Sequence, residues 1–300
     1  MGLERATARV SEAELTLVVC TRDRAEQLRA GIAAVAQIRS ARPWEIVVVD
    51  NGSTDHTTEV VEQAMASAPV PLRLLAEPIA NVSRARNVGA RATSSPILAF
   101  TDDDCYPSPT HVDHILERFA AHPDLGFVCG AVELHDPDDA SVATVTLPDR
   151  LLFSRGSFVT PGIVLTANLA FRRAAFDAVG GFDELFGYGS GPGGGDVDAA
   201  VRVLAAGWQG LYDPALAVRH HHGRKPGSAV DAARRSYDVG RGMFYAKCAF
   251  DRRLRRTYLA GWARLTWGRI RRGESLRPVL RELRGAFRYV RVRVRGTTRS

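Results

Sequence analysis

The sequence predicts an α/β fold whose core is a largely parallel sheet flanked by helices. Apolar, β-branched runs recur along the first 105 residues, and stretches with helical periodicity separate them. Such runs are typical of strands that are buried on both faces, and their alternation with helices indicates right-handed βαβ units. The expected strands are 15–20, 45–49, 72–75 and 97–100, and the expected helices between them are 25–38, 54–66 and 83–92.

Polar side chains follow three of these strands, at the point where each strand ends. The polar ends are Thr21, Arg22 and Asp23 after the first strand, Asp50, Asn51 and Ser53 after the second, and Asp102, Asp103 and Asp104 after the fourth. Because ligands of open α/β sheets sit beyond the carboxyl ends of the strands, we expect these residues to border one nucleotide-binding crevice.

The most informative cluster is the acidic triplet Asp102, Asp103 and Asp104. Adjacent carboxylates repel one another unless a cation neutralises them, and oxygen-only clusters suit hard cations such as Mg²⁺ or Mn²⁺. A divalent cation that holds a diphosphate is one interpretation. The other is a turn that caps the helix expected to start near Pro109, since Asp is common in turns and helix caps.

Six short motifs carry a family resemblance. In the first half they are VVVDNGSTD at 47–55, SRARNVGA at 83–90 and TDDD at 101–104. They continue with NLAFR at 168–172, GGFDE at 180–184 and GGDVD at 194–198. In this order and spacing, the chain resembles the family 2 glycosyltransferases of the GT-A fold, a Rossmann-like mixed sheet flanked by helices. The resemblance covers about the first 220 residues.

The resemblance implies a metal-dependent, inverting enzyme that moves a sugar from a nucleotide-diphosphate sugar to a hydroxyl of a glycan or a lipid-linked acceptor. Asp102 and Asp104 would form the D-x-D pair that holds Mn²⁺ or Mg²⁺, and His220 would be a third metal ligand. The alternative to nucleotide binding by Arg86 is an arginine on a solvated helix face. The alternative to metal binding by His220 is a histidine in a solvated loop. The residues expected to bind the nucleotide-sugar are Thr21, Arg22, Asp23, Asp50, Asn51, Ser53, Arg86, Asp102, Asp103 and Asn168.

Asp196 is the expected general base. It follows the glycine run 187–195 and opens a helical stretch, so a flexible loop would present its carboxylate to the acceptor hydroxyl. The alternative is a carboxylate that caps its own helix, and the helix N-terminus would lower its pKa. Members of the family usually carry Glu before this Asp, whereas this chain has Gly195, and Asp198 is a candidate to compensate.

The positive charge is concentrated near the end of the chain. Residues 251–300 contain sixteen Arg against Asp251, Glu274 and Glu282, a net of +13, so the other 250 residues carry −6 of the total of +7. We expect a catalytic domain at 1–225, with the nucleotide-sugar part at about 1–105 and the acceptor part at about 106–225. A basic helical extension would follow at 226–300, broken at Gly261, Gly268, Gly273 and Pro278. Its arginines and aromatic residues suit an anionic membrane surface, or else a solvated flank of helices packed on the catalytic domain.

Other classes of protein fit less well. The chain has no apolar run long enough to cross a membrane, and residues 1–10 lack the core of a signal peptide. We therefore expect a cytoplasmic protein, peripheral on the inner face of the membrane if the tail binds lipid, with free cysteines. A sugar-1-phosphate nucleotidyltransferase would carry a glycine-rich loop where residues 21–24 stand. A nucleic-acid-binding protein would explain the arginines but not the acidic strand ends, so no nucleic acid is expected.

Overall fold

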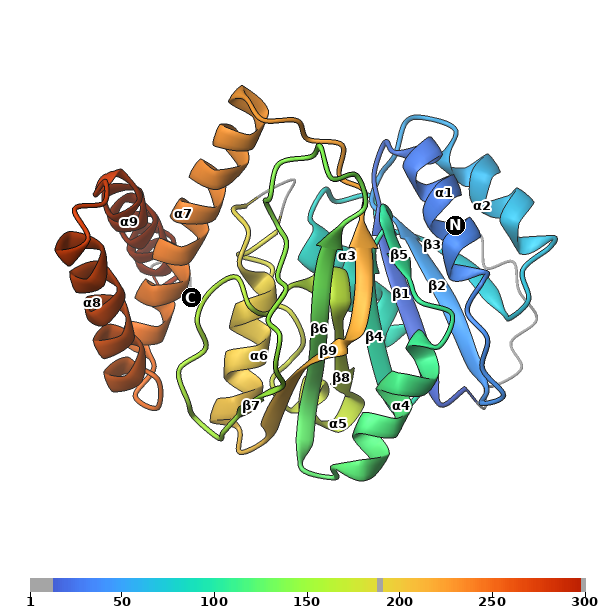
Figure 1. The fold of residues 1–300 in the computed structure, drawn as a ribbon, viewed down its shortest axis with the longest axis horizontal. Helices are drawn as coiled ribbons and strands as arrows, with labels where there is room; N and C mark the ends of the chain where they lie inside the picture. Colours follow the sequence, from blue (N-terminus) through green and yellow to red (C-terminus); the bar gives the residue numbers. More distant parts are fainter. Residues whose placement is uncertain (1–12, 188–190, 298–300) are drawn as a thin grey trace.

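The computed structural model describes residues 13–187 and 191–297. Three segments lie outside this described part: residues 1–12, which include the expected absence of a signal peptide at 1–10, residues 188–190 of the glycine run, and residues 298–300 of the tail. The described residues form a mixed α/β structure around a nine-stranded sheet, which confirms the predicted fold class (Figure 1). Because several strand ends meet at one edge of this sheet, the sheet determines where polar side chains can converge.

The sheet has a parallel half and a mixed half. Its strand order is β3-β2-β1-β4-β8-β6-β9-β5, and β7 pairs with β9. The pairs from β3 to β4 are parallel, β8 is antiparallel to both β4 and β6, and β9 is parallel to β6 but antiparallel to β5 and β7. The strands are β1 (Leu15–Thr21), β2 (Trp44–Asp50), β3 (Leu72–Ala76), β4 (Ile97–Asp102), β5 (Cys105–Pro107), β6 (Leu125–Leu134), β7 (Leu151–Phe153), β8 (Leu169–Arg172) and β9 (Gln209–His220).

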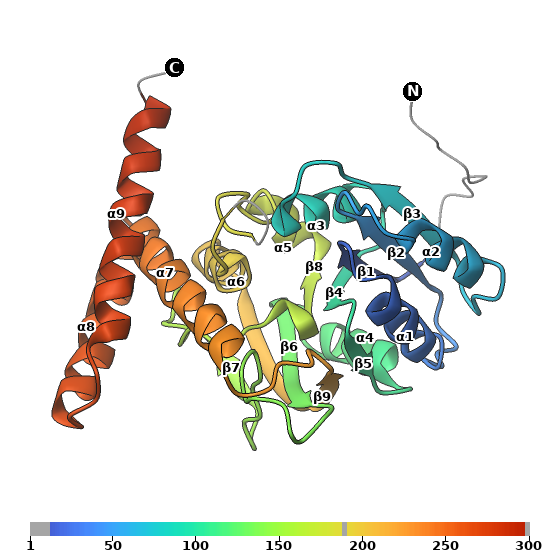
Figure 2. The same ribbon diagram turned by 90° about the horizontal axis from the view of Figure 1, so that it is seen from above.

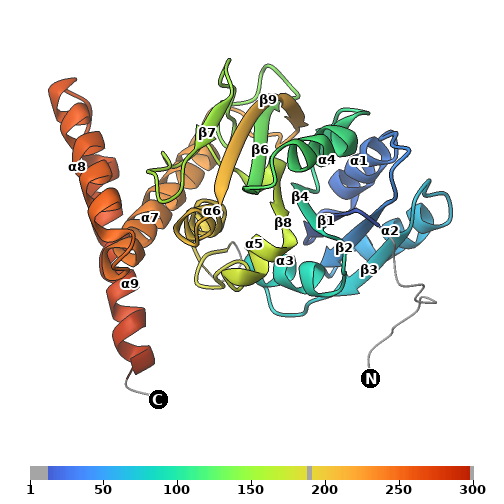
Figure 3. The ribbon, with the colours of Figure 1, turned by 90° about the horizontal axis from the view of Figure 1, so that it is seen from below.

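Helices cover both faces of the sheet, and alternate strand residues pack against each layer. Val47 and Val49 face the core shared with α3, α5, α6 and α7, whereas Ile46 and Val48 face the core shared with α1, α2 and α4 (Figure 3). This explains why the strands are apolar at nearly every position. The helices on the sheet are α1 (Ala25–Val35), α2 (Thr57–Met65), α3 (Val82–Arg91), α4 (His111–Ala121), α5 (Arg173–Ala178), α6 (Gly195–Ala205) and α7 (Ser228–Phe250), with a short 3₁₀ turn η1 (Thr166–Asn168).

The longest strand contains a proline. It is β9, which runs through Asp213 and Pro214 to His220. Proline cannot donate to a sheet, so it is tolerated where the pairing is interrupted. The register with β6 shifts there, because Gly130 pairs with Asp213 while Ala131 pairs with Ala217. This bulge allows the strand to continue to the histidines.

The last two helices lie beyond α7, on its side away from the sheet (Figure 2). They are α8 (Arg255–Arg271) and α9 (Arg277–Thr297). The predicted breaks at Gly261, Gly268 and Pro278 were wrong. Gly261 packs on Phe158, whose ring would lie 2.1 Å from a Cβ at this position, and Pro278 lies in the first turn of α9, where its missing N–H costs nothing. The turn between the helices contains Gly273, which has a φ of 65°.

No described helix is both long enough and apolar enough to cross a membrane. All four cysteines are free thiols, as predicted.

Candidate active site

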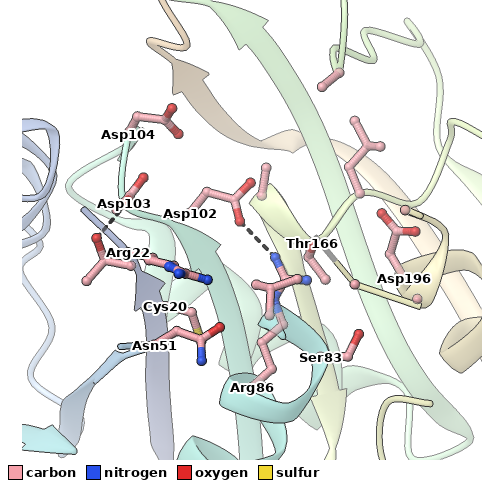
Figure 4. Close-up of a pocket in the computed structure, with 18 of the residues that line it drawn as sticks. Cys20, Arg22, Asn51, Ser83, Arg86, Asp102, Asp103, Asp104, Thr166 and Asp196 are labelled. Atoms are coloured by element: carbon pink, nitrogen blue, oxygen red, sulfur yellow. Dashed lines mark hydrogen bonds and ion pairs between the residues drawn. The ribbon is translucent and has the colours of Figure 1, made fainter. Parts of the chain in front are cut away.

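A cavity of about 350 Å³ opens at the carboxyl ends of β1 and β4 (Figure 4). Its lining comes from the turn after β1, the start of α3, the end of β4, η1, the loop before α6, the end of β9 and α7. Nine of the predicted site residues are part of this lining: Thr21, Arg22, Asn51, Arg86, Asp102, Asp103, Asp104, Asp196 and His220. Segments more than 200 residues apart in the chain, from Cys20 to Tyr237, therefore contribute to one cavity.

Each carboxylate of the acidic triplet has its own partners. Asp102 accepts a hydrogen bond from the Arg86 guanidinium at 3.0 Å. Asp103 accepts a hydrogen bond from the Thr21 hydroxyl at 2.7 Å and pairs with Arg24 at 3.0 Å. The guanidinium of Arg24 also pairs with Asp104. The repulsion expected among three carboxylates is thus offset by two arginines, so these side chains hold defined positions.

Strand pairing brings His220 next to Asp104. Cys105 of β5 lies opposite His220 of β9, and the backbone N–H of His221 donates to the carbonyl oxygen of Asp104 at 2.8 Å. The Nε2 atom of His220 lies 3.2 Å from Oδ1 of Asp104. His221 and His222 follow the strand and have other contacts. Nδ1 of His221 lies 2.9 Å from the hydroxyl oxygen of Tyr106, and the ring of His222 packs edge-on against that of His220, with 5.1 Å between the ring centroids.

The ion pair between Asp104 and His220 shifts both pKa values. Burial by itself would raise the pKa of Asp104, but the hydrogen bond and charge of His220, together with Arg24, hold this pKa below its ordinary value. Burial would lower the pKa of His220, and Asp104 outweighs it, so the pKa of this imidazole is raised. Each of the two groups therefore favours the charged form of the other.

The donor atoms at this end of the cavity fit a divalent cation. Ligand atoms of Asp102, Asp104, Cys105 and His220 all lie within 4.8 Å of one another. Two carboxylates and an imidazole are a suitable donor set for Mn²⁺. Burial raises the pKa of the Cys105 thiol well above its ordinary value, so the thiol stays protonated and is a poor ligand. Asp102, Asp104 and His220 are the residues that could hold the cation.

Asp196 lies across the cavity from Asp102, in the first turn of α6 (Figure 4). The residue that caps this helix is Gly194, whose φ of 118° suits glycine, so Asp196 is not the helix cap. Its Oδ1 accepts a hydrogen bond from the N–H of Val197 at 2.9 Å. Burial raises the pKa of Asp196, and this outweighs the lowering by Val197 and by Arg86. The predicted lowering by the helix N-terminus was therefore wrong, because desolvation is the larger effect.

The glycine that replaces the usual Glu is closely packed. A Cβ on Gly195 would lie 2.9 Å from Oγ of Ser83. This hydroxyl is buried, lines the cavity and has no hydrogen-bond partner among the described residues. Asp198 is not placed to compensate for the missing Glu, because it is absent from the described lining and pairs with Arg202 at 2.8 Å and with Lys247 at 2.6 Å.

Four predicted binding residues are absent from the described lining. Asp23 and Ser53 connect the loop after β1 with the loop after β2, because Oγ of Ser53 accepts a hydrogen bond from the N–H of Asp23 at 3.0 Å. Asp50 accepts from the N–H of Ser53 at 2.8 Å. The amide of Asn168 donates to the carbonyl oxygens of Ala131 and Leu216 at 2.9 and 2.8 Å. These contacts hold the backbone around the cavity, and direct binding by the four residues stays a prediction.

Several lining residues were missed by the sequence reasoning: Arg24, Ser83, Thr166, Arg224 and Tyr237. Arg24 could have been found, because it stands in the polar turn after the first strand and the acidic triplet requires positive partners. Ser83 lies within the motif at 83–90. Arg224 lies between β9 and α7, and Tyr237 belongs to α7, where no motif marks them.

Comparisons with known proteins identify the family and the fold. Residues 16–180 match the family described as "Glycosyl transferase family 2". The chain is 30% identical, over 221 residues, to a validoxylamine A glucosyltransferase of Streptomyces hygroscopicus subsp. jinggangensis, covering 64% of this chain and 52% of that protein. It is 27% identical, over 251 residues, to the glycosyltransferase AglE of Haloferax volcanii, covering 83% of this chain and 79% of that protein. The chain spans about half the length of the validoxylamine A glucosyltransferases that it matches.

Solved structures share the fold. The mannosyltransferase PcManGT from Pyrobaculum calidifontis, in complex with GDP-Man and Mn²⁺, has a TM-score of 0.63 at 20% identity, covering 83% of this chain and 68% of that chain. Residues 1–349 of S. aureus TarS, in complex with UDP-GlcNAc, have a TM-score of 0.62 at 14% identity, covering 80% of this chain and 67% of that chain. The predicted GT-A fold is confirmed. Because the matched family region spans more than half of the 300 residues, the chain belongs to glycosyltransferase family 2.

Proposed function

We propose that this protein is a metal-dependent, inverting glycosyltransferase that moves a sugar from a nucleotide-diphosphate sugar to an acceptor hydroxyl. The observation that carries the proposal is the arrangement of one cavity. Asp102, Asp104 and His220 converge at one end, and Asp196, with its raised pKa, lies across from Asp102. An ion-binding end and a proton-accepting side are the two elements that such a transfer requires.

The donor would lie against the ends of β1 and β4. Asp102, Asp104 and His220 would hold Mn²⁺ or Mg²⁺, which when bound supplies positive charge to the departing diphosphate. Arg22 and Arg86 border the same cavity and are suited to phosphate oxygens, because a guanidinium donates in a fixed fork. PcManGT and TarS have been described with GDP-Man and UDP-GlcNAc, so purine and pyrimidine donors both occur on this fold.

Asp196 would act as the general base. Its Oδ atom takes the proton of the acceptor hydroxyl while the hydroxyl oxygen forms a bond to the anomeric carbon, and the bond from that carbon to the diphosphate oxygen breaks. The attack comes from the face opposite the leaving group, which inverts the configuration. A pKa above the ordinary Asp value makes the carboxylate a stronger base, so burial favours this role.

The two parts of the catalytic domain would have different roles, one for the donor and one for the acceptor. Residues 1–105 would supply most of the donor site, and residues 106–225 would supply Asp196, His220 and the acceptor side. The acceptor is a glycan or a lipid-linked molecule. Relatives named for validoxylamine A and for pre-mycofactocin illustrate that the named acceptors of similar chains differ widely.

Thermal unfolding with candidate donors tests the proposal. UDP-, GDP- and dTDP-sugars are each added with and without Mn²⁺, and we expect one class to raise the Tm only when Mn²⁺ is present. At a concentration of 100 Kd, a ligand adds about 2.7 kcal/mol to the free energy of unfolding, a readily measured shift. Asp104→Asn should abolish the Mn²⁺-dependent part, whereas Asp138→Ala, at an exposed carboxylate outside the cavity lining, should retain it. Equal stabilisation with and without the ion would contradict metal dependence.

A further inference from the structure

Helix α9 is held to the protein by one side only. Gly285 and Tyr289 are buried on this side. The contact with α7 is so close that a Cβ on Gly242 would lie 1.8 Å from the carbonyl oxygen of Glu282, and a Cβ on Gly285 would lie 2.0 Å from that of Val239. The side chain of Glu282 accepts hydrogen bonds from Arg241 and from the indole of Trp262, both at 2.9 Å. The inner side of α9 is therefore packed against α7 and hydrogen-bonded to α7 and α8.

The outer side of α9 carries an apolar stripe. Its members recur at intervals of four and three residues, which places them along one line of a helix. Phe287 is 72% exposed and Leu280 is 57% exposed. Single exposed apolar side chains are common on proteins, but a contiguous line of them indicates an interaction surface. The apolar stripe consists of Leu276, Leu280, Leu283, Phe287 and Val290. Figure 2 shows α9 at the end of the molecule, beyond α7, so none of the sheet or its covering helices lies over the stripe.

An arginine row runs along one flank of this stripe. At 100° per residue, its members fall within the quarter of the helix surface next to Leu280 and Phe287. All four are exposed, and none forms an ion pair with another residue of the described part of the chain. The arginine row consists of Arg277, Arg284, Arg288 and Arg291.

The acidic residues near α9 do not neutralise this row. Glu282 is turned inward to Arg241, and Glu274 pairs with Arg269 and Arg272. The outer side of α9 is consequently apolar and cationic at once, without compensating negative charge among the described residues. Exposed aromatic and aliphatic side chains also occur on α8, where Trp267 is 61% exposed.

We infer that the apolar stripe and the arginine row together dock the protein on an anionic lipid bilayer. A helix with one apolar side and a strongly cationic flank lies in the plane of a membrane interface, where apolar side chains enter the acyl boundary and arginines meet lipid phosphates. Pairing with a second copy of this chain is less suited to the outer side of α9, because it would bring two arginine rows together without acidic partners. This docking surface is independent of the transfer chemistry proposed above.

Cosedimentation of the full chain with vesicles tests this inference. We expect binding to phosphatidylcholine vesicles that contain 30% phosphatidylglycerol, weak binding to pure phosphatidylcholine, and loss of binding as salt concentration rises. Each arginine near an anionic surface adds about fivefold to the affinity, so the double change Arg284→Gln and Arg288→Gln should weaken binding on the order of 25-fold. The matched control is Arg39→Gln with Arg91→Gln, which removes two exposed arginines elsewhere and should change binding little.

A second variant separates the contribution of the apolar stripe to vesicle binding from that of the arginine row. Leu280→Gln with Phe287→Gln leaves the charge unchanged and should also reduce binding to anionic vesicles by tenfold or more, on the order expected for two exposed large side chains. Because both side chains are exposed, circular dichroism and Tm should match the wild type. Equal binding to neutral and anionic vesicles, or equal loss with the control pair, would overturn the inference. So would a wild-type dimer that becomes monomeric in this variant while no vesicle binding is seen.

Discussion

Replacing Asp196 with Asn changes one oxygen of the side chain to an amide nitrogen and removes the proposed proton acceptor. The remaining oxygen can still accept the hydrogen bond from the N–H of Val197, so the first turn of α6 should persist. Asp102 and Asp104, the proposed contacts to the donor, lie across the cavity, and we expect nucleotide binding to be retained. The variant therefore separates binding from chemistry.

The magnitude follows from the role of the carboxylate. Proton removal by a positioned base typically contributes 10²- to 10⁴-fold, so kcat should fall by about this factor, which corresponds to ~3–5 kcal/mol in the activation free energy. Burial raises the pKa of Asp196 above 3.8. Because the base form exists only above this pKa, kcat/KM of the wild type should fall on acidification with a midpoint above 3.8, and this acid limb should be absent in the variant.

The assay measures release of the nucleoside diphosphate over a range of pH, with donor binding measured separately by Mn²⁺-dependent thermal shift. Asp198→Asn is the matched control, two residues further along the same helix. It breaks the buried pairs with Arg202 and Lys247 and should lower the free energy of unfolding by about 3–5 kcal/mol, while kcat is unchanged below the unfolding temperature. Near wild-type turnover of Asp196→Asn would refute the assignment of the base.

Two further predictions concern stability. Gly242→Ala should lower the free energy of unfolding by about 1–3 kcal/mol in urea titrations, because its Cβ would meet the backbone of α9. The control, Gly268→Ala on α8, should be neutral or stabilising. Equal effects of the two changes would contradict the close crossing of α7 and α9. Burial lowers the pKa of His111 to about 4, so below pH 6.5 the unfolded chain binds a proton that the folded chain does not. Stability should therefore fall by about 2 kcal/mol between pH 7 and pH 5 on account of this residue, and His111→Leu should reduce that slope; an unchanged slope would refute the role of His111.

The parallel half of the sheet was predictable because its signals are local. The expected strand at 45–49 became β2 (Trp44–Asp50), and the expected helix at 83–92 became α3 (Val82–Arg91). Continuous apolar runs determine such strands regardless of what lies beside them. The convergence of Asp102 and Asp50 at one edge of the sheet follows from parallel pairing alone, although only Asp102 turned out to line the cavity.

The remaining features depend on tertiary packing. The sequence motif marks Asp196, but its raised pKa arises from burial in the assembled protein. Gly261 reads as a helix breaker in the sequence, yet it lies within α8 because Phe158, about 100 residues earlier, occupies the space beside it. The polar turn after the first strand marks Arg24, but its contacts with Asp103 and Asp104 arise because β1 and β4 are neighbours. The partners in contacts of this kind are determined by tertiary packing.

The packing of α7 bears on how the chain could be shortened. A cut at residue 225, which the composition suggests, would remove α7, and a Cβ on its Gly240 would lie only 2.1 Å from the carbonyl oxygen of Gly193, in the loop just before Asp196. Lys247 of α7 also neutralises Asp183 and Asp198. Crystallisation or directed-evolution work on a minimal catalytic unit should therefore place the new terminus after residue 250, since an earlier one would remove the helix that packs behind Asp196, the proposed base.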